Sequence, residues 1–502
     1  MPQAQSVALP TRVPLGWNIE TRDATLNKDA LLVNCYVETD RAAGVVNVFR
    51  RPGYSLWLHP TGFPLVSTDL AGGIFQFGGY VYYTFGGKTY EYHHPTTVLI
   101  NWGAQTTYIP VYHTAVMGGK PGVVIGNTAD AFLINMNQAV TGPFHTTDAD
   151  YPTFTNPGFA YLDGTVYVMQ STLTPTSGGA IIYGSNINSV DGATSWDPLN
   201  FLTAQMTPEG GIYLAKHLGY VVALKEFSTE FFYDAGNATG SPLAPAENLF
   251  FSYGCANPYT VQKVGESLIW VATTKDVNYQ VIVMENTRPT VISTPAIERI
   301  LNSIVLDNSK AVYSWHLIVN THVFYGLTLK DLNITLVYDS LEKMWYQWTD
   351  VNGNYLPFVA VTGGSGIPFL AQHEKNGSIY VWDSDYNADN ILEAKYGFAN
   401  YHGDSIPIML RTPRWDGGTA RQKNLNSLAF VGDVIPGKII TVETSDDDYQ
   451  TWSTPKKVDL GMEYPNLVNC GTFRRRAWRI TSNDFLPFRM QFMELQIDIG
   501  TL

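Results

Sequence analysis

The chain has 502 residues, only 15% of them charged, and its formal net charge is −13. This acidic balance argues against a general nucleic-acid binder, which would carry a basic stripe. No run approaches the roughly 18 consecutive apolar residues of a membrane span, so no membrane-spanning segment is expected. The opening residues, MPQAQSVALPTRVPLG, also lack the charged start and apolar stretch of a signal peptide.

Three cysteines, Cys35, Cys255 and Cys470, lie far apart in the sequence. They form neither a disulfide framework nor a paired metal motif. We therefore expect free thiols in a protein made in a reducing cytoplasm.

The composition favours β-structure. Aromatic residues make up 13% of the chain, and they are enriched on half-buried pleated surfaces and at interfaces. The 44 glycines and 28 prolines would separate many short strands with turns. We predict an all-β protein.

Residues 1–60 combine proline-rich and polar stretches with one strand-like run, ALLVNCYVE. Such a segment cannot form a core alone. We predict an extended N-terminal arm and docking strand.

A repeated pattern organises residues 61–400. Each unit is a turn residue followed by alternating apolar positions, a polar break and a second such run, as expected for a β-hairpin. The units begin at Gly79, Gly122, Gly164, Gly219, Glu266, Thr321 and Gly377. Recurrence at roughly 40–55 residues indicates a β-propeller of six or seven blades, with an irregular stack of sandwiches as the alternative.

One helix is expected, in STPAIERIL at 293–301. Thr294 can cap it, Pro295 fits the first helical position, and Ile297 and Leu301 share a face.

In residues 401–502 the spacing between hairpin-like runs changes again. The runs LNSLAFVGDV, GKIITVETS and MQFMELQIDIG alternate cleanly, which predicts an additional C-terminal β-sandwich-like region.

Three turns carry an Asp followed by a Trp, and they resemble the aspartate-box turn of some β-propellers. In that turn the carboxylate ties down backbone N–H groups and the Trp packs beneath. The glycine usual in the box is replaced by Ala193 and Tyr449. The matching residues are Ser189, Asp191 and Trp196, then Asp339 and Trp345, then Ser445, Asp447 and Trp452.

The acidic triplet Asp446–Asp448 lies in the last of these turns. A calcium loop needs alternating ligands and a glycine, whereas these aspartates are consecutive. We predict a structural turn, with a weak surface cation site and a catalytic role as the alternatives.

Arginines gather only after residue 400. A sialidase-like glycosidase would need such residues to converge on the propeller mouth, which this position does not favour. We predict a solvated or interface face, with contact to DNA phosphates as the alternative. The arginines considered for a glycosidase site are Arg411, Arg414, Arg474, Arg475, Arg476 and Arg479; the prediction of an interface or DNA-facing surface concerns the last four, in the segment RRRAWR.

The familiar catalytic, nucleotide-binding and zinc motifs are absent from the sequence. We therefore predict no catalytic, cofactor-binding or metal site, and a protein that is not an enzyme.

Several segments, taken in order, resemble the packaged-DNA stabilisation or tail-nozzle (tail-hub) proteins of short-tailed bacteriophages. The likeness spans nearly the full length. The segments are NKDALLVNCYVE (27–38), FRRPGYSLW (49–57), TSWDPLNFLTAQ (194–205), KEFSTEFFYDAGN (225–237), VISTPAIERIL (291–301), LVYDSLEKMWYQW (336–348) and FRRRAWRITSNDFLPFRMQFMELQIDIG (473–500).

The resemblance implies a structural virion protein that forms a homo-hexameric ring below the portal and its adaptor. The ring would extend and close the DNA channel, retain packaged DNA, and carry fibres or tailspikes and a needle or plug. Genomic DNA would pass through the lumen without sequence-specific binding, and assembly would take place in the host cytoplasm. The alternative is a sialidase-like propeller that binds or cleaves host surface polysaccharide.

Overall fold

The computed structural model describes residues 10–26, 28–59, 71–77, 79–86, 88–93, 96–100, 112–116, 122–135, 140, 142–171, 179–276, 278–307, 312–364 and 367–500. Strands account for 54% and helices for 5%, so the predicted all-β class is confirmed. The chain divides into two compact units. The first contains Met1–Leu56, Ile318–Leu356 and Trp382–Leu502, and the second contains Trp57–Leu317 and Pro357–Val381.

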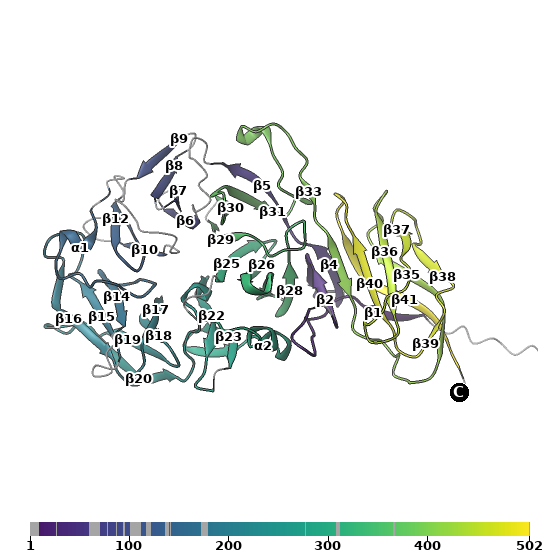
Figure 1. Cartoon of the computed structure of the whole chain (residues 1–502), viewed down its shortest axis with the longest axis horizontal. Coiled ribbons are helices and arrows are strands. Elements are labelled where there is room, and N and C mark those ends of the chain that lie inside the picture. The colour runs from purple at the N-terminus through teal and green to yellow at the C-terminus, as the bar shows by residue number, and fades with distance from the viewer. Residues whose placement is uncertain are drawn as a thin grey trace, which may run out of the picture. The chain divides into compact units, whose positions relative to one another are not determined.

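The second unit is built from consecutive antiparallel sheets, which Figure 1 shows following one another from the purple to the teal part of the chain. The first two sheets are β6 (Ala71–Phe77), β7 (Tyr80–Phe85), β8 (Lys88–His93) and β9 (Thr96–Ile100), then β10 (Tyr112–Val116), β11 (Gly122–Gly126) and β12 (Ala131–Asn135). The short helix α1 (Phe144–Thr147) follows them.

The next three sheets repeat the same up-and-down order. They are β13 (Ala160–Leu162), β14 (Thr165–Ser171), β15 (Ala180–Ser185) and β16 (Trp196–Ala204); β17 (Gly211–His217), β18 (Tyr220–Lys225), β19 (Thr229–Asp234) and β20 (Leu243–Phe251); and β21 (Gln262–Val264), β22 (Ser267–Thr273), β23 (Tyr279–Glu285) and β24 (Arg288–Val291). A further sheet has the order β29 (Phe358–Gly364), β30 (Ile367–His373), β31 (Ile379–Asp383) and β5 (Gly53–Leu58).

The sheets have a β-propeller arrangement, as predicted. The first strands β29, β6, β10, β13 and β17 contact one another in that order. Most predicted repeats coincide with the second strand of a sheet: Gly79, Gly164 and Gly219 directly precede β7, β14 and β18. The repeat at Gly377 instead precedes β31, the third strand of its sheet. Hydrophobic clusters fill the spaces between neighbouring sheets; one joins Met169 of β14 to Leu214 of β17, and the next joins Phe231 of β19 to Trp270 of β22.

Within the described residues, five separate four-stranded blades are present. This is fewer than the six or seven predicted, and two further strand groups explain the difference. The sheet β10–β12 has three strands, and β25 (Val312–Val319), β26 (His322–Leu329), β27 (Ile334–Asp339) and β28 (Met344–Trp348) belong to a larger sheet. In that sheet β28 pairs in parallel with β2 (Leu31–Val33). The four strands β25–β28 are therefore part of a larger sheet and are not a separate blade.

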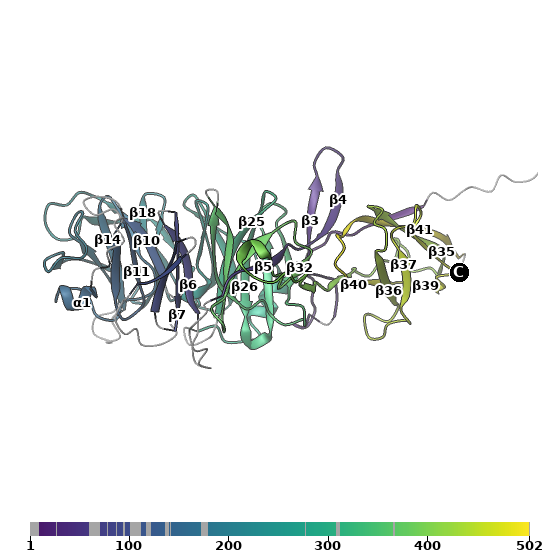
Figure 2. The same cartoon turned by 90° about the horizontal axis from the view of Figure 1, so that it is seen from above.

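The first unit contains the remaining strands. After β28 and β2, the larger sheet continues through β34 (Ile408–Arg411), β40 (Ala477–Ser482), β36 (Ile439–Ser445) and β37 (Lys456–Asp459). A second sheet contains β1 (Thr11–Pro14), β3 (Cys35–Asp40), β4 (Val45–Arg50), β35 (Lys423–Gly432), β38 (Asn466–Val468), β39 (Thr472–Phe473) and β41 (Arg489–Ile499). Figure 2 shows β3 and β4 as a long hairpin, and β1 pairs with β41.

The helix α2 (Pro295–Leu301) forms where the sequence predicts it. Thr294 caps it by accepting the Ile297 N–H, Pro295 occupies the first turn, and Ile297 and Leu301 are buried. Within the described residues no helix is long and apolar enough to cross a bilayer. The described residues also contain no cluster of three or more His, Cys, Asp or Glu side chains that could hold a metal ion.

Candidate functional site

The acidic turn lies between β36 and β37. Ser445 donates its hydroxyl to Asp447 at 2.9 Å, and Asp447 accepts the Thr451 N–H at 3.0 Å and its hydroxyl at 2.5 Å. These bonds, that of the Thr451 hydroxyl first, lower the pKa of Asp447 to about 2. The backbone φ angles of Asp448 and Tyr449 are +61° and +67°, so the chain reverses sharply here. The Asp447 carboxylate is therefore ionised when it holds the turn together.

The two neighbouring aspartates bind different arginines. Asp446 forms a two-bond contact with Arg476, at 2.7 and 2.8 Å. Asp448 accepts from Arg414 at 2.5 Å, and this bond lowers the pKa of Asp448. The three carboxylates are thus committed to separate partners rather than to one shared centre.

The arginines of the RRRAWR segment fall into two groups. Arg476 is buried against the Phe473 ring, and Arg479 is paired with Glu443 at 2.7 Å while lying over the Trp452 ring. Arg474 and Arg475 are exposed. In the described part of the chain neither has a carboxylate within ion-pair distance, although Arg474 donates to the Ala420 carbonyl at 3.2 Å. Within this segment, Arg474 and Arg475 are the exposed arginines without an acidic partner among the described residues.

Arg411 is committed to the interior. It is buried and donates to the carbonyls of Leu26, Lys28 and Asp29. Burial lowers the Arg411 pKa to about 10. This arginine fastens the N-terminal segment to β34.

The second turn joins β15 to β16. Ser189 lies 2.8 Å from the Ser195 hydroxyl, which also accepts the Gly192 N–H at 2.7 Å. Trp196 is buried and donates its indole N–H to the Val190 carbonyl at 3.1 Å. Its backbone N–H is bound by Asp148 at 2.8 Å, and Asp191 is half-buried in the turn. Ser195 and the distant Asp148 therefore also bind backbone N–H groups of this turn.

The third turn, between β27 and β28, contains an interaction that the sequence did not predict. Asp339 is fully buried, accepts the Leu341 N–H at 2.9 Å and binds His322 Nδ1 at 2.7 Å. Burial opposes charge on the imidazole, but Asp339 outweighs it, so the pKa of His322 is raised. His322 Nε2 lies 3.8 Å from Glu38, and Trp345 is buried beside the turn.

A second unpredicted feature is a buried ion pair in the first unit. The side chains of Arg51 and Asp389 are both fully buried and contact at 2.5 and 2.9 Å. Arg51 also binds the Asn34 side chain and the Thr349 carbonyl. Burial disfavours the guanidinium charge, but the attraction of Asp389 holds the Arg51 pKa above its ordinary value. The only sequence signal was an arginine within an otherwise strand-like segment.

Apart from the exposed Arg474 and Arg475, these residues position backbone or neutralise one another. Among the residues that the sequence singled out, the geometry brings together no nucleophile, base and oxyanion donor of the kind that catalysis requires. The hydrogen bonds and ion pairs of these residues fix turns and join strands that are distant in the sequence.

The family model described as "Bacteriophage P22 Gp10, beta-propeller" matches residues 80–362, more than half of the chain. The chain belongs to this family. It is a phage DNA-stabilisation β-propeller protein and a virion component. The matched range contains the complete blades from β13 to β24 and the turns at 189–196 and 339–345.

Two solved structures illustrate the similarity, both at low identity. The Pan2 WD40 domain of Neurospora crassa is 10% identical, with 67% of this chain and 95% of that one covered and a TM-score of 0.38. The extracellular domain of a putative hybrid two-component system, BT4673 from B. thetaiotaomicron, is 9% identical, with coverages of 91% and 61% and a TM-score of 0.42. No curated protein matches the chain.

Proposed function

We propose that this protein is a non-enzymatic subunit of a homo-hexameric nozzle or hub ring in a bacteriophage tail. The ring lies below the portal and its adaptor, extends and closes the DNA channel, and retains packaged DNA. It carries fibres or tailspikes and accommodates a needle or plug. The observation that carries the proposal is the family match over residues 80–362.

The surface composition supports a role in assembly. Only 15% of residues are charged, and large apolar side chains are exposed in both units. Examples are Phe154 and Leu199 in the second unit, and Met462 and Val468 in the first. Exposed apolar groups are typical of surfaces that other subunits cover. We propose that contacts between subunits and with neighbouring tail proteins use such residues.

The charge balance supports passage of DNA without tight binding. At a net charge of −13, the chain repels a polyanion at short range, even though salt screens this repulsion beyond roughly 8–10 Å. We propose that Arg474 and Arg475 are the arginines left for an interface or for DNA phosphates, because Arg476 and Arg479 are neutralised by acidic partners.

We also propose a division of labour along the chain. Residues 1–60 act as the N-terminal arm and docking strand, residues 61–400 as the propeller, and residues 401–502 as the closing β domain. Pairing of β1 with β41 and of β2 with β34 supports the docking role. Three free cysteines support assembly in the reducing host cytoplasm.

Glycan binding or cleavage is the second candidate function. One observation favours binding: an open groove between β18 and β20 is lined by two tyrosines, a glutamate and an asparagine. The aspartate-containing turns do not add support for cleavage, because Asp339 and Asp447 hold backbone and neighbouring side chains.

The DNA-retention role can be tested with phage particles assembled without this protein. We expect heads that fill with DNA and then lose it, as measured by nuclease-sensitive DNA and by the fraction of full heads in electron micrographs. Adding the purified chain back to freshly filled heads should restore retention. Full heads that stay nuclease-resistant without the protein would contradict the proposal.

A further inference from the structure

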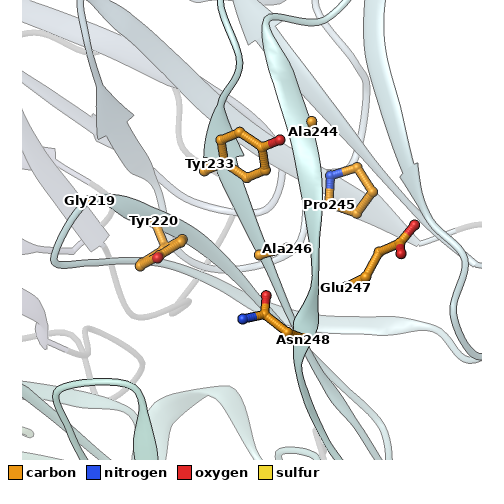
Figure 3. Close-up of a pocket in the computed structure, with 8 residues that line it drawn as sticks. All are labelled: Gly219, Tyr220, Tyr233, Ala244, Pro245, Ala246, Glu247 and Asn248. Carbon is orange, nitrogen blue, oxygen red and sulfur yellow. The ribbon is translucent and has the colours of Figure 1, made fainter.

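The groove on the sheet β17–β20 has the size of a small-molecule site. Its volume is about 930 Å³, and it is lined by Gly219, Tyr220, Tyr233, Ala244, Pro245, Ala246, Glu247 and Asn248. It lies where the turn before β18 faces the ends of β19 and β20 (Figure 3). Sites of roughly 300–1,000 Å³ with a few polar groups are typical for small ligands.

A bulge in β20 shapes this groove. Phe232 pairs with Pro245 and Glu230 pairs with Phe250, so residues 246–249 lie opposite Phe231 alone. β20 is also the outermost strand of its sheet. Bulges of this kind re-aim side chains and are over-represented at sheet edges and next to active sites. The bulge places Ala246 and Asn248 beside the two tyrosines (Figure 3).

Four polar side chains around the groove have no partner among the residues that the structure describes. In the part of the chain that the structure describes, the Tyr220 and Tyr233 hydroxyls, the Glu247 carboxylate and the Asn248 amide make no hydrogen bond or ion pair. The Tyr220 ring is held edge-on against Phe231 at 5.8 Å, whereas Tyr233 is 43% exposed. The site therefore offers aromatic surface, small alanines and four unused hydrogen-bonding side chains.

We propose that this groove binds a neutral or amine-bearing saccharide. A sugar ring has an apolar C–H face that can cover a tyrosine, and hydroxyls that both donate to a carboxylate and accept from an amide. No cationic side chain lines the groove, and the whole chain is acidic. Uronic and sialic acids are therefore disfavoured, because their carboxylates would find no counter-charge in the groove and would be repelled by the acidic chain, Glu247 included.

The site binds rather than cleaves. Glycoside hydrolysis ordinarily uses two carboxyl groups on either side of the scissile bond. Among the lining residues Glu247 is the single acid, and Figure 3 shows it directed away from Tyr220. This function goes beyond DNA retention and does not depend on it.

The test uses the purified full chain on an array of bacterial surface polysaccharides, half neutral or amine-bearing and half acidic. We expect retention of neutral or amine-bearing members, and a roughly fivefold to tenfold loss of apparent affinity for Tyr233→Ala, which removes the exposed ring. Tyr464→Ala is the matched control, because Tyr464 is 56% exposed but lies in the first unit. It should bind like the wild type.

Asn248→Ala, at an exposed edge position, provides a second variant should Tyr233→Ala fail to fold, as judged by circular dichroism. It should also weaken binding, and Glu247→Gln should relax the discrimination against acidic polysaccharides. Four results would overturn the proposal: no retained polysaccharide, retention unchanged in the groove variants, a preference for acidic members, or release of free sugar. Because the assay contains no heads or DNA, its failure is distinguishable from failure of the tail function.

Discussion

Arg51 and Asp389 show how single residues hold the first unit together. The pair is fully buried, and its remaining hydrogen-bonding capacity is used by Asn34, Pro52 and Thr349. A buried pair of this kind is costly to break, because removal of one partner leaves an uncompensated charge in the interior.

Asp389→Ala should destabilise the protein by roughly 3–5 kcal/mol, as measured by urea unfolding of the full chain. Lys263→Ala, which removes an exposed ion pair with Glu266, is the control and should change the unfolding free energy by less than about 1 kcal/mol. If the two variants lost equal stability, the buried network would not have the structural role assigned to it.

His322 and Asp339 should make stability depend on pH. The folded pKa of His322 is raised above its unfolded value of roughly 6.5, so the added stability is fully present below that pH. It is lost as the pH rises through the folded pKa. Glu38, Glu342 and the Tyr36 ring also face this imidazole.

Unfolding of the wild type and of His322→Gln should therefore be compared from pH 5.5 to pH 9. The wild-type advantage should be larger at the acidic end by about 1 kcal/mol, the difference between a charged and a neutral hydrogen bond. An advantage that is constant with pH, or larger at pH 9, would show that His322 remains neutral when buried.

At the scale of elements, the turn between β36 and β37 depends on one ionised carboxylate. Asp447→Ala should increase hydrogen exchange of the Thr451 N–H several-fold, because that group loses its acceptor. Asp447 has a lowered pKa of about 2, so the turn should stay closed above roughly pH 4 and open as the pH falls toward 2. Asp459→Ala, at the end of β37, is the control and should leave exchange of the Thr451 N–H unchanged. Equal exchange rates in the two variants would show that contacts other than Asp447 hold the turn.

The elements themselves were largely predictable from the sequence. Hairpins beginning near Gly79, Gly164 and Gly219 follow from alternation of apolar residues, and α2 follows from Thr294 and Pro295. Such signals are local, so they are visible in one stretch of sequence. The parallel pairing of β2 with β28 brings Val33 next to Gln347, and no local pattern encodes that register.

The candidate site was less predictable for the same reason. Asp339 and Asp447 were recognised from their spacing to a tryptophan, but their partners were not. His322 begins β26 and Asp339 ends β27, so the two residues meet only when that hairpin forms. Asp389 lies far along the chain from its partner Arg51. The groove at Tyr233 depends on a bulge in β20, and a bulge changes register without leaving a distinct residue pattern.

At the scale of the whole molecule, the account depends on repeated sheets joined by apolar clusters and on family membership over residues 80–362. The proposed ring would need faces that neighbouring subunits cover, and exposed residues such as Phe154 and Met462 would provide apolar surface for them.

Electron cryo-microscopy of intact virions tests this most directly. We expect a ring of six copies below the portal and adaptor, with the propeller sheets of each copy fitting the density around a continuous DNA channel. Virions whose tails contain no density for this chain, or contain it as a single peripheral copy, would contradict the account.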